Sequence, residues 1–262
     1  MGVRSRLRRR IFLSPRLCAF SAGNRRSPSP GFRVVKGALR VGTCGFPVAR
    51  DRFFSELDAV EITSTASRLP KIETAERWKS EAPPGFTFAV RAPREIGGGD
   101  SPFRMTPALR KTVRDFGAVL AVLSPAFVVY DTSPVFYPSA DHMRAMYGYF
   151  KGSGRGPWRI VWMPRGRQFE TKLLTKIASD LKLMIGFDAL RAEEAPRETR
   201  YWRLGGRWEG RRVSRGVSFT DTELRDAVSR CASGRESFLF LENAAMWRDA
   251  RRLKHYTVTG RF

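Results

Sequence analysis

Eight short apolar segments, rich in β-branched and aromatic residues, recur along this 262-residue chain, and most are followed by a stretch with helical spacing. In order, these segments are Leu39–Gly45, Ala59–Ala66, Phe86–Pro93, Ala118–Pro125, Arg159–Arg165, Lys182–Asp188, Arg200–Gly206 and Ser237–Asn243. Short strands alternating with longer amphipathic segments are typical of parallel-sheet folds. Eight such units in about 250 residues fit one closed barrel. We therefore predict an α/β fold with a single TIM-like (β/α)8 barrel over residues 34–262.

Several of the segments between the predicted strands carry helix start signals. Thr106 precedes a proline, a pattern typical of a helix N-cap followed by the first helical residue. Thr220 and Glu223 have the spacing of a capping box. Further amphipathic helices are predicted over Ser139–Gly152 and Glu170–Leu181. The first crossover helix, within Val48–Leu57, is short, and Ala189–Thr199 shows no amphipathic helix.

The segment of residues 1–33 is a separate, basic region. Residues 1–38 hold ten Lys and Arg and no acidic residue, and Ser27–Gly31 reads as an unpacked linker. We expect residues 1–33 to be disordered. Three explanations stand for this segment: a translation start placed too far upstream, an organellar transit peptide, or a basic arm that grips phosphates.

The whole chain is strongly basic, with 48 Lys and Arg against 25 Asp and Glu and a formal net charge of +23. An excess of this size favours polyanionic partners, namely nucleic acid or a phosphorylated small molecule. A generally basic composition without a specific partner is the alternative explanation.

Cysteine usage and hydropathy indicate a soluble protein of a reducing compartment, which we take to be the cytoplasm. Cys18, Cys44 and Cys231 are odd in number and lack Cys-x-x-Cys spacing, which argues against disulfides and a structural zinc site. The sequence has no long uncharged apolar stretch, so we predict no membrane span. The sequence also shows no dinucleotide fingerprint, Walker loop or nucleophile elbow, and we predict no cofactor.

Candidate functional residues lie at the carboxyl ends of the predicted strands, where TIM barrels carry their active sites. Alternation along the second strand directs Glu61, Thr63 and Thr65 into the lumen. The other strand ends supply Thr43, Arg91, Arg165, Tyr201, Arg203 and either Glu242 or Asn243. An unpaired carboxylate inside a barrel is costly, so we expect Glu61 to pair with Arg91 or Arg203.

Two interpretations of this group follow. In the catalytic one, Glu61 is a general acid or base tuned by Arg91 and Arg203. In the structural one, Glu61 and the arginines are buried ion pairs that fill the lumen. No histidine or second placed carboxylate completes the group.

The loop after the seventh strand is a candidate phosphate site. It combines glycines with arginines at Gly205, Gly206, Arg207, Gly210, Arg211, Arg212 and Arg215. Glycines let backbone N–H groups approach an anion, and one arginine guanidinium can donate two parallel hydrogen bonds to phosphate oxygens. Trp208 could stack on a nucleic-acid base. A solvated basic loop is the alternative interpretation.

Metal and thiol chemistry are disfavoured. Metal-dependent barrels place several His, Asp and Glu residues at the strand ends, whereas His142 and His255 both fall in predicted helices. Cys44 ends the first strand, but no histidine is placed to activate its thiol.

Several motifs resemble those of the YecE-like proteins, the domain-of-unknown-function family numbered seventy-two. They are Val41-Gly42-Thr43-Cys44-Gly45-Phe46, Val60–Thr65 followed by Arg68-Leu69-Pro70, Pro84–Pro93, Tyr201–Gly206 and Leu241-Glu242-Asn243. The resemblance spans about residues 39–253. It implies a TIM-like barrel and no settled activity.

This chain also departs from that family. Gly205 stands where the family's late Tyr-x-Arg-Leu-His-Gly strand has histidine, and Ala66 replaces an aromatic residue. Met163-Pro164-Arg165-Gly166 keeps an arginine but lacks the acid and histidine of the family's fifth strand. The resemblance therefore implies a divergent member.

Three functions remain open from the sequence. The first is a cationic barrel mouth that binds a phosphate-bearing ligand, with nucleic acid among the candidates. The second is a small-molecule hydrolase or lyase that uses Glu61 as its acid or base. The third is a catalytically silent barrel kept for interaction.

Overall fold

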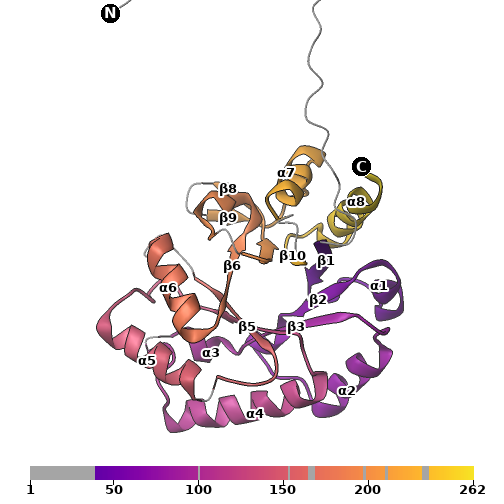
Figure 1. Cartoon of the computed structure of the whole chain (residues 1–262). Helices are drawn as coiled ribbons and strands as arrows, with labels where there is room; N and C mark the ends of the chain where they lie inside the picture. The colour runs from indigo at the N-terminus through magenta and orange to yellow at the C-terminus, as the bar shows by residue number, and fades with distance from the viewer. Residues whose placement is uncertain are drawn as a thin grey trace, which may run out of the picture. The chain divides into compact units, whose positions relative to one another are not determined.

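The computed structural model describes residues 39–99, 101–152, 154–164, 169–196, 199–209, 212–231 and 236–262. Eight of its strands are parallel and close into a barrel in the order β1-β10-β7-β6-β5-β4-β3-β2 (Figure 1). These strands are β1 Leu39–Cys44, β2 Ala59–Ile62, β3 Thr87–Arg91, β4 Phe127–Asp131, β5 Arg159–Met163, β6 Met184–Asp188, β7 Tyr201–Leu204 and β10 Ser237–Leu241. The predicted TIM-like barrel is therefore confirmed.

Helices surround this barrel (Figure 1). The α-helices are α1 Arg50–Glu56, α2 Ile72–Glu81, α3 Arg94–Gly97, α4 Pro107–Leu123, α5 Ala140–Lys151, α6 Thr171–Leu181, α7 Asp221–Cys231 and α8 Met246–Thr259. Two 3-10 helices, Ser64–Ala66 and Ala189–Glu194, follow β2 and β6. As expected, the first crossover helix has only seven residues, and a 3-10 helix replaces an amphipathic helix between β6 and β7.

Apolar side chains pack in two layers that the strand alternation separates. The larger layer fills the space between the barrel and its helices, and the smaller one fills the lumen. In the lumen, the rings of Phe127 and Phe238 meet edge to face at 4.7 Å, and the Arg159 guanidinium covers the Phe127 ring at 4.2 Å. The lumen is therefore packed below the mouth, which leaves the carboxyl ends of the strands, where TIM barrels carry their sites, as the place to look for a functional site.

The fourth predicted strand, Ala118–Pro125, was wrong. Most of this run belongs to α4, which Thr106 caps by accepting a hydrogen bond from the Leu109 N–H. The apolar spacing of Phe116, Leu120 and Leu123 continues the buried face of that helix to its end. The true strand, β4, follows Ser124 and ends at Asp131.

Two further boundaries differ from the prediction. The second strand stops at Ile62, because the chain turns into a 3-10 helix at Ser64–Ala66. After β7, the arginine-rich loop forms a small antiparallel hairpin of β8 Arg207–Glu209 and β9 Arg212–Ser214.

The capping box before α7 is confirmed. The Glu223 carboxylate accepts from the Thr220 N–H at 2.8 Å, and the Thr220 hydroxyl accepts from the Glu223 N–H at 3.2 Å. The disorder expected for residues 1–33 falls outside the described residues. In the part of the chain that is described, no helix combines the length and the apolar character needed to cross a membrane.

Candidate functional site

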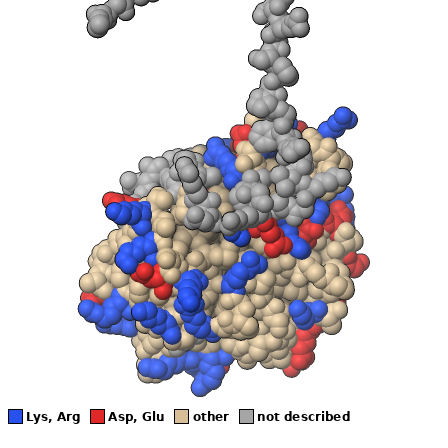
Figure 2. All heavy atoms as spheres, viewed as in Figure 1, with Lys and Arg blue, Asp and Glu red and all other residues tan. Residues whose placement is uncertain are grey.

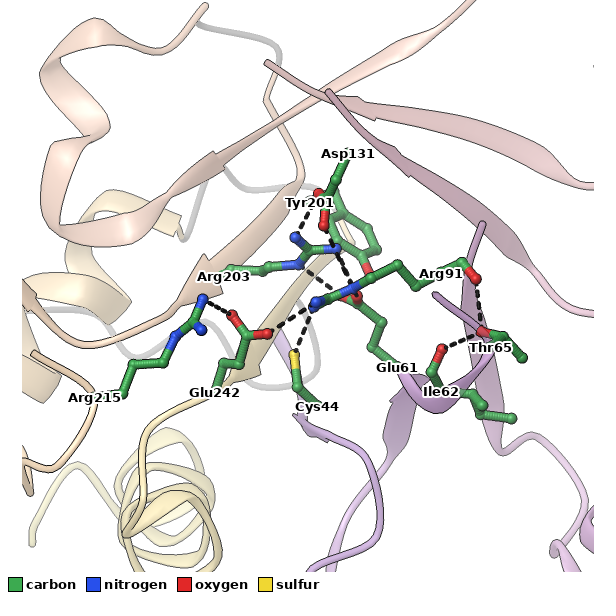
Figure 3. Close-up of polar contacts among 10 residues, drawn as sticks. All are labelled: Cys44, Glu61, Ile62, Thr65, Arg91, Asp131, Tyr201, Arg203, Arg215 and Glu242. Carbon is green, nitrogen blue, oxygen red and sulfur yellow. Dashed lines mark hydrogen bonds and ion pairs between the residues drawn. The ribbon is translucent and has the colours of Figure 1, made fainter. Parts of the chain in front are cut away.

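Glu61 of β2 lies at the centre of a polar network at the barrel mouth (Figure 3). Its side chain is fully buried. The Arg91 Nε donates to its Oε1 at 2.7 Å, and Arg203 donates from Nη2 to Oε1 at 2.5 Å and from Nε to Oε2 at 2.8 Å. The Tyr201 hydroxyl donates to Oε2 at 2.7 Å. The expected pairing of Glu61 is therefore present with both arginines.

Two more carboxylates extend this network towards solvent. Asp131 at the end of β4 accepts from Arg203 Nη1 at 2.7 Å, and Glu242 after β10 accepts from Arg91 Nη1 at 2.9 Å. Each of these carboxylate side chains is 18% exposed, against 11% for Arg91 and 7% for Arg203. The network thus runs from a buried floor at Glu61 to carboxylates that solvent can reach.

Glu61 is held ionised by its neighbours. Burial opposes the charged form, but the positive charges of Arg203 and Arg91 and the hydrogen bonds from Arg203 and Tyr201 outweigh it and lower the pKa of Glu61 to about 2. Both carboxylate oxygens already accept two hydrogen bonds each. The geometry therefore suits Glu61 to hold Arg91 and Arg203 in place better than to exchange protons with a ligand.

The Glu242 carboxylate accepts one hydrogen bond from each of two arginines. Arg91 Nη1 donates to Oε1 at 2.9 Å, and Arg215 Nη2 donates to Oε2 at 3.1 Å (Figure 3). Arg91 comes from the barrel wall, whereas Arg215 follows β9 and is 55% exposed. The two arginines form a clamp on one carboxylate at the edge of the mouth.

Asp188 at the end of β6 lies in a different environment. Its Oδ1 accepts from the Leu190 N–H at 2.9 Å, and its Oδ2 lies 3.4 Å from the Gly205 N–H. Burial raises the pKa of Asp188, although backbone N–H groups and the positive charge of Arg191 partly oppose this shift. The N–H of Gly205, expected to face an external anion, thus faces a carboxylate of the protein itself.

The residues of the predicted phosphate-binding loop do not all point to one place. Arg207 forms a two-bonded pair with Glu223, at 2.9 and 3.0 Å, on the side of α7. Arg212 is exposed on β9. Gly206 has a positive φ of 153°, and a Cβ there would lie 2.3 Å from the Ser214 carbonyl oxygen, so the hairpin requires glycine at this position. Arg165 and Arg211 fall outside the described residues.

Three residues predicted to bind a ligand make hydrogen bonds within the protein in this structure. The Thr43 hydroxyl donates to the Gly45 carbonyl at 2.7 Å, and the Thr65 hydroxyl, in the 3-10 helix, lies 2.6 Å from the Arg91 carbonyl. The Asn243 amide donates to the Val217 carbonyl and to the Asp249 carboxylate, both at 2.8 Å. These contacts fix the loops around the mouth.

Cys44 ends β1 beside the network, with its Sγ 3.7 Å from Arg91 Nη2. Burial and the charge of Glu61 raise the pKa of this thiol well above its usual value. A protonated, buried thiol is a poor nucleophile, so Cys44 serves here as a small packed residue.

The described part of the mouth is not cationic at its centre. Four carboxylates and four arginines gather there: Glu61, Asp131, Asp188, Glu242, Arg91, Arg203, Arg215 and, beside Asp188, Arg191. Within the described residues, no group of three or more His, Cys, Asp or Glu side chains is arranged to hold a metal ion. His142 lies in α5 and His255 in α8, as the sequence predicts.

Sequence reasoning missed Asp131 and Asp188 as site residues. Asp131 was missed because the fourth strand was placed inside α4, which left the end of β4 unassigned. Asp188 was recognised as the last residue of a strand, and its position at the carboxyl end of that strand is the signal that could have identified it.

The barrel is similar to that of several solved structures. A DUF72 family protein from Enterococcus faecalis V583 has a TM-score of 0.66 at 14% identity, over 85% of this chain and 97% of that chain. A DUF72 family protein from Thermotoga maritima MSB8 has a TM-score of 0.62 at 16% identity, over 83% and 98% of the two chains. A xylose isomerase domain containing protein from Salmonella typhimurium LT2 has a TM-score of 0.57 at 11% identity, over 81% and 92%. At such identities these likenesses establish the fold alone.

The family itself is established from the sequence. No curated protein matches the chain significantly. A family model described as "Protein of unknown function DUF72" matches residues 51–258, which is most of the chain, and confirms the resemblance carried by the strand motifs. This chain therefore belongs to the DUF72 family.

Proposed function

We propose that the barrel mouth binds a phosphate-bearing ligand between Arg91 and Arg215. The observation that carries this proposal is the clamp on Glu242, in which each arginine donates to a different oxygen of one carboxylate. Paired N–H donors from two arginines suit a tetrahedral phosphate as well as a planar carboxylate. In this view Glu242 occupies the position that a ligand anion takes.

The surroundings of the clamp support ligand exchange at this position. Arg215 is 55% exposed, and Glu242 lies at the end of β10 with 18% of its side chain exposed. An exposed ion pair contributes only about 0–1 kcal/mol, so an incoming dianion can compete with Glu242 for Arg215, the exposed side of the clamp, more readily than for Arg91, which is 11% exposed. Arg91 remains anchored meanwhile, because its Nε is held by the buried Glu61.

The phosphate group that binds between Arg91 and Arg215 can belong to a small molecule or to nucleic acid. The net charge of +23 attracts both. Figure 2 shows basic side chains outnumbering acidic ones over α4, α5 and α6, where seven basic residues are exposed. They are Arg110, Lys111, Arg114, Arg144, Lys151, Lys172 and Lys176. Sugar phosphates are natural small probes, because one structural neighbour is named as a xylose isomerase domain containing protein.

Inorganic phosphate binding, measured by titration calorimetry, tests the proposal. Arg215→Met removes one side of the clamp and is expected to weaken phosphate binding about tenfold, whereas Glu242→Gln removes the competing charge and is expected to tighten it. Arg114→Gln, on the exposed face of α4, removes the same charge far along the chain and serves as the matched control. Equal affinities for wild type, Arg215→Met and Arg114→Gln would contradict the clamp.

A salt series with single-stranded and duplex oligonucleotides separates the two sources. A nucleic-acid ligand gives a steep fall of affinity with salt, and the slope shrinks by about one when a phosphate-contacting arginine is removed. A sugar phosphate that binds while oligonucleotides do not identifies a small-molecule site. Failure of every phosphate compound to bind would leave the barrel as an interaction module.

A further inference from the structure

Asp249 of α8 is a fully buried carboxylate that ties two segments of the chain together. Its Oδ1 accepts from the Ser218 hydroxyl at 2.8 Å and from Arg252 Nη1 at 2.9 Å. Its Oδ2 accepts from the Phe219 N–H at 2.9 Å and from the Asn243 side-chain amide at 2.8 Å. Asp249 thus joins the segment that precedes α7 to the loop that follows β10.

The segment that precedes α7 carries one side of the clamp. We call residues 215–219, which lead from β9 towards α7, the Arg215 segment. Its backbone bonds to the loop after β10: the Ala244 N–H donates to the Arg215 carbonyl at 2.7 Å, and the Asn243 side-chain amide donates to the Val217 carbonyl at 2.8 Å. The backbone that carries Arg215 is therefore fixed to the same loop that carries its carboxylate partner.

We infer that Asp249 is a positioning residue that determines where the Arg215 guanidinium lies at the barrel mouth. A different buried carboxylate then holds each side of the clamp. Glu61 bonds directly to the Arg91 side chain, whereas Asp249 holds the backbone of the Arg215 segment. This division fits the exposed fractions, because Arg91 is 11% exposed and packed in place, whereas Arg215 is 55% exposed and depends on its backbone for its position. The inference rests on the proposed function, since it concerns the affinity of the clamp for phosphate.

A fixed backbone favours ligand binding for an entropic reason. A long exposed side chain loses rotamer freedom when it binds a ligand, and motion of its backbone would add to that loss. The bonds to Asp249 remove the backbone part before the ligand arrives, and they hold the donors of Arg215 beside those of Arg91. These bonds involve Ser218 and Phe219, so they persist when a phosphate takes the place of the Glu242 carboxylate.

Amide hydrogen exchange tests whether Asp249 holds the Arg215 segment. Ser218→Ala removes one donor to Asp249, and Asp249→Asn places an amide group against the same donors. Both variants are expected to speed exchange of the Ala244 N–H, which bonds to the Arg215 carbonyl, on the order of tenfold. Ser229→Ala is the matched control, because the Ser229 hydroxyl donates to a carbonyl within α7, and it should keep the wild-type rate. An unchanged Ala244 rate in Ser218→Ala and Asp249→Asn overturns the inference.

Phosphate calorimetry tests whether this anchoring matters for binding. Asp249→Asn should lower the affinity for inorganic phosphate about as far as Arg215→Met does, roughly tenfold, and Ser218→Ala should lie between this variant and wild type. Neither change should lower the affinity further in an Arg215→Met background, because the side chain that the segment positions is already gone. A merely structural role would reduce binding equally in both backgrounds. Should Asp249→Asn not fold, Ser218→Ala provides the same comparison, because it removes a single hydrogen bond.

The outcomes separate this inference from the clamp. Phosphate binding by wild type that Asp249→Asn and Ser218→Ala leave unchanged overturns the positioning role while the clamp stands. Equal losses of affinity with and without the Arg215 side chain overturn it as well. Absence of phosphate binding by wild type overturns the clamp, and with it the role of Asp249 in ligand binding.

Discussion

Arg203 binds Glu61 through two of its nitrogens, with Nη2 2.5 Å from Oε1 and Nε 2.8 Å from Oε2. The two residues are 142 positions apart in the chain, and both side chains are almost entirely removed from solvent. A two-bonded pair of this kind fixes the orientation of the guanidinium as well as its position. Glu61 therefore determines where the remaining donor of Arg203 meets Asp131.

Replacement of Glu61 by glutamine leaves two buried arginines without their common counter-charge. We expect Glu61→Gln to lower the free energy of unfolding by about 3–5 kcal/mol, the range seen when one partner of a buried ion pair is removed. Denaturant unfolding at neutral pH measures this loss. Glu95→Gln in α3 changes an exposed carboxylate and should leave stability nearly unchanged. A similar small effect for both variants would show that the network contributes little.

The contribution of Glu61 to the free energy of unfolding should depend on pH. Its pKa is lowered to about 2 from an ordinary 4.5, so its contribution is fully present above about pH 4.5 and is lost as the pH falls towards 2. Each pKa unit corresponds to about 1.4 kcal/mol, which makes the total about 3 kcal/mol. Unfolding curves of wild type and Glu61→Gln should converge over this pH interval. Parallel curves would contradict the ionised state of Glu61.

The Tyr201 hydroxyl supports the same carboxylate from the lumen. Tyr201→Phe removes a buried hydrogen bond to a charged group and is expected to cost about 1.5–3 kcal/mol. Tyr147→Phe is the matched control, because the Tyr147 hydroxyl donates to Asp180 at the same distance of 2.7 Å on an exposed surface. Thermal and denaturant unfolding should show a clearly larger loss for Tyr201→Phe than for Tyr147→Phe, and equal losses would contradict the argument.

Asp188 should have the opposite pH dependence. Because burial raises its pKa, the protonated form favours the folded state, and its contribution is present at low pH and lost as the pH rises through the raised value. The stability of Asp188→Asn relative to wild type should therefore increase with pH. Unfolding measurements at several pH values between acid and neutral test this, with Asp226→Asn as an exposed control. A difference that does not change with pH would rule out the raised pKa.

Much of the fold and part of the site could be predicted from the sequence. Strand alternation and the cost of a lone buried carboxylate are local arguments, and they correctly placed Glu61 with Arg91 and Arg203. The choice between Glu242 and Asn243 could not be made, because it depends on where the chain leaves β10. The structure places Glu242 in the mouth and Asn243 in the loop contacts of Asp249.

The remaining features of the fold and the site depend on contacts between segments far apart in the chain, so the sequence alone could not predict them. The apolar run in α4 reads equally well as a strand until its continuity with the capped helix is known, and that error hid Asp131. The arginines of the loop after β7 suggest a basic mouth when counted alone. Their carboxylate partners, Glu223 for Arg207 and Glu242 for Arg215, follow later in the chain, and only the three-dimensional arrangement reveals them.

The position of Glu61 has a consequence for how the chain folds. Its partners belong to β3 and β7: Arg91 of β3 pairs with Oε1, but Oε2 has no donor until Tyr201 and Arg203 join the growing barrel. Contacts of such long sequence separation form late, because loop closure must precede them. A nascent chain that ends before β7 cannot bury Glu61 without a large penalty, and the network thus favours completion of the whole barrel over any partial one.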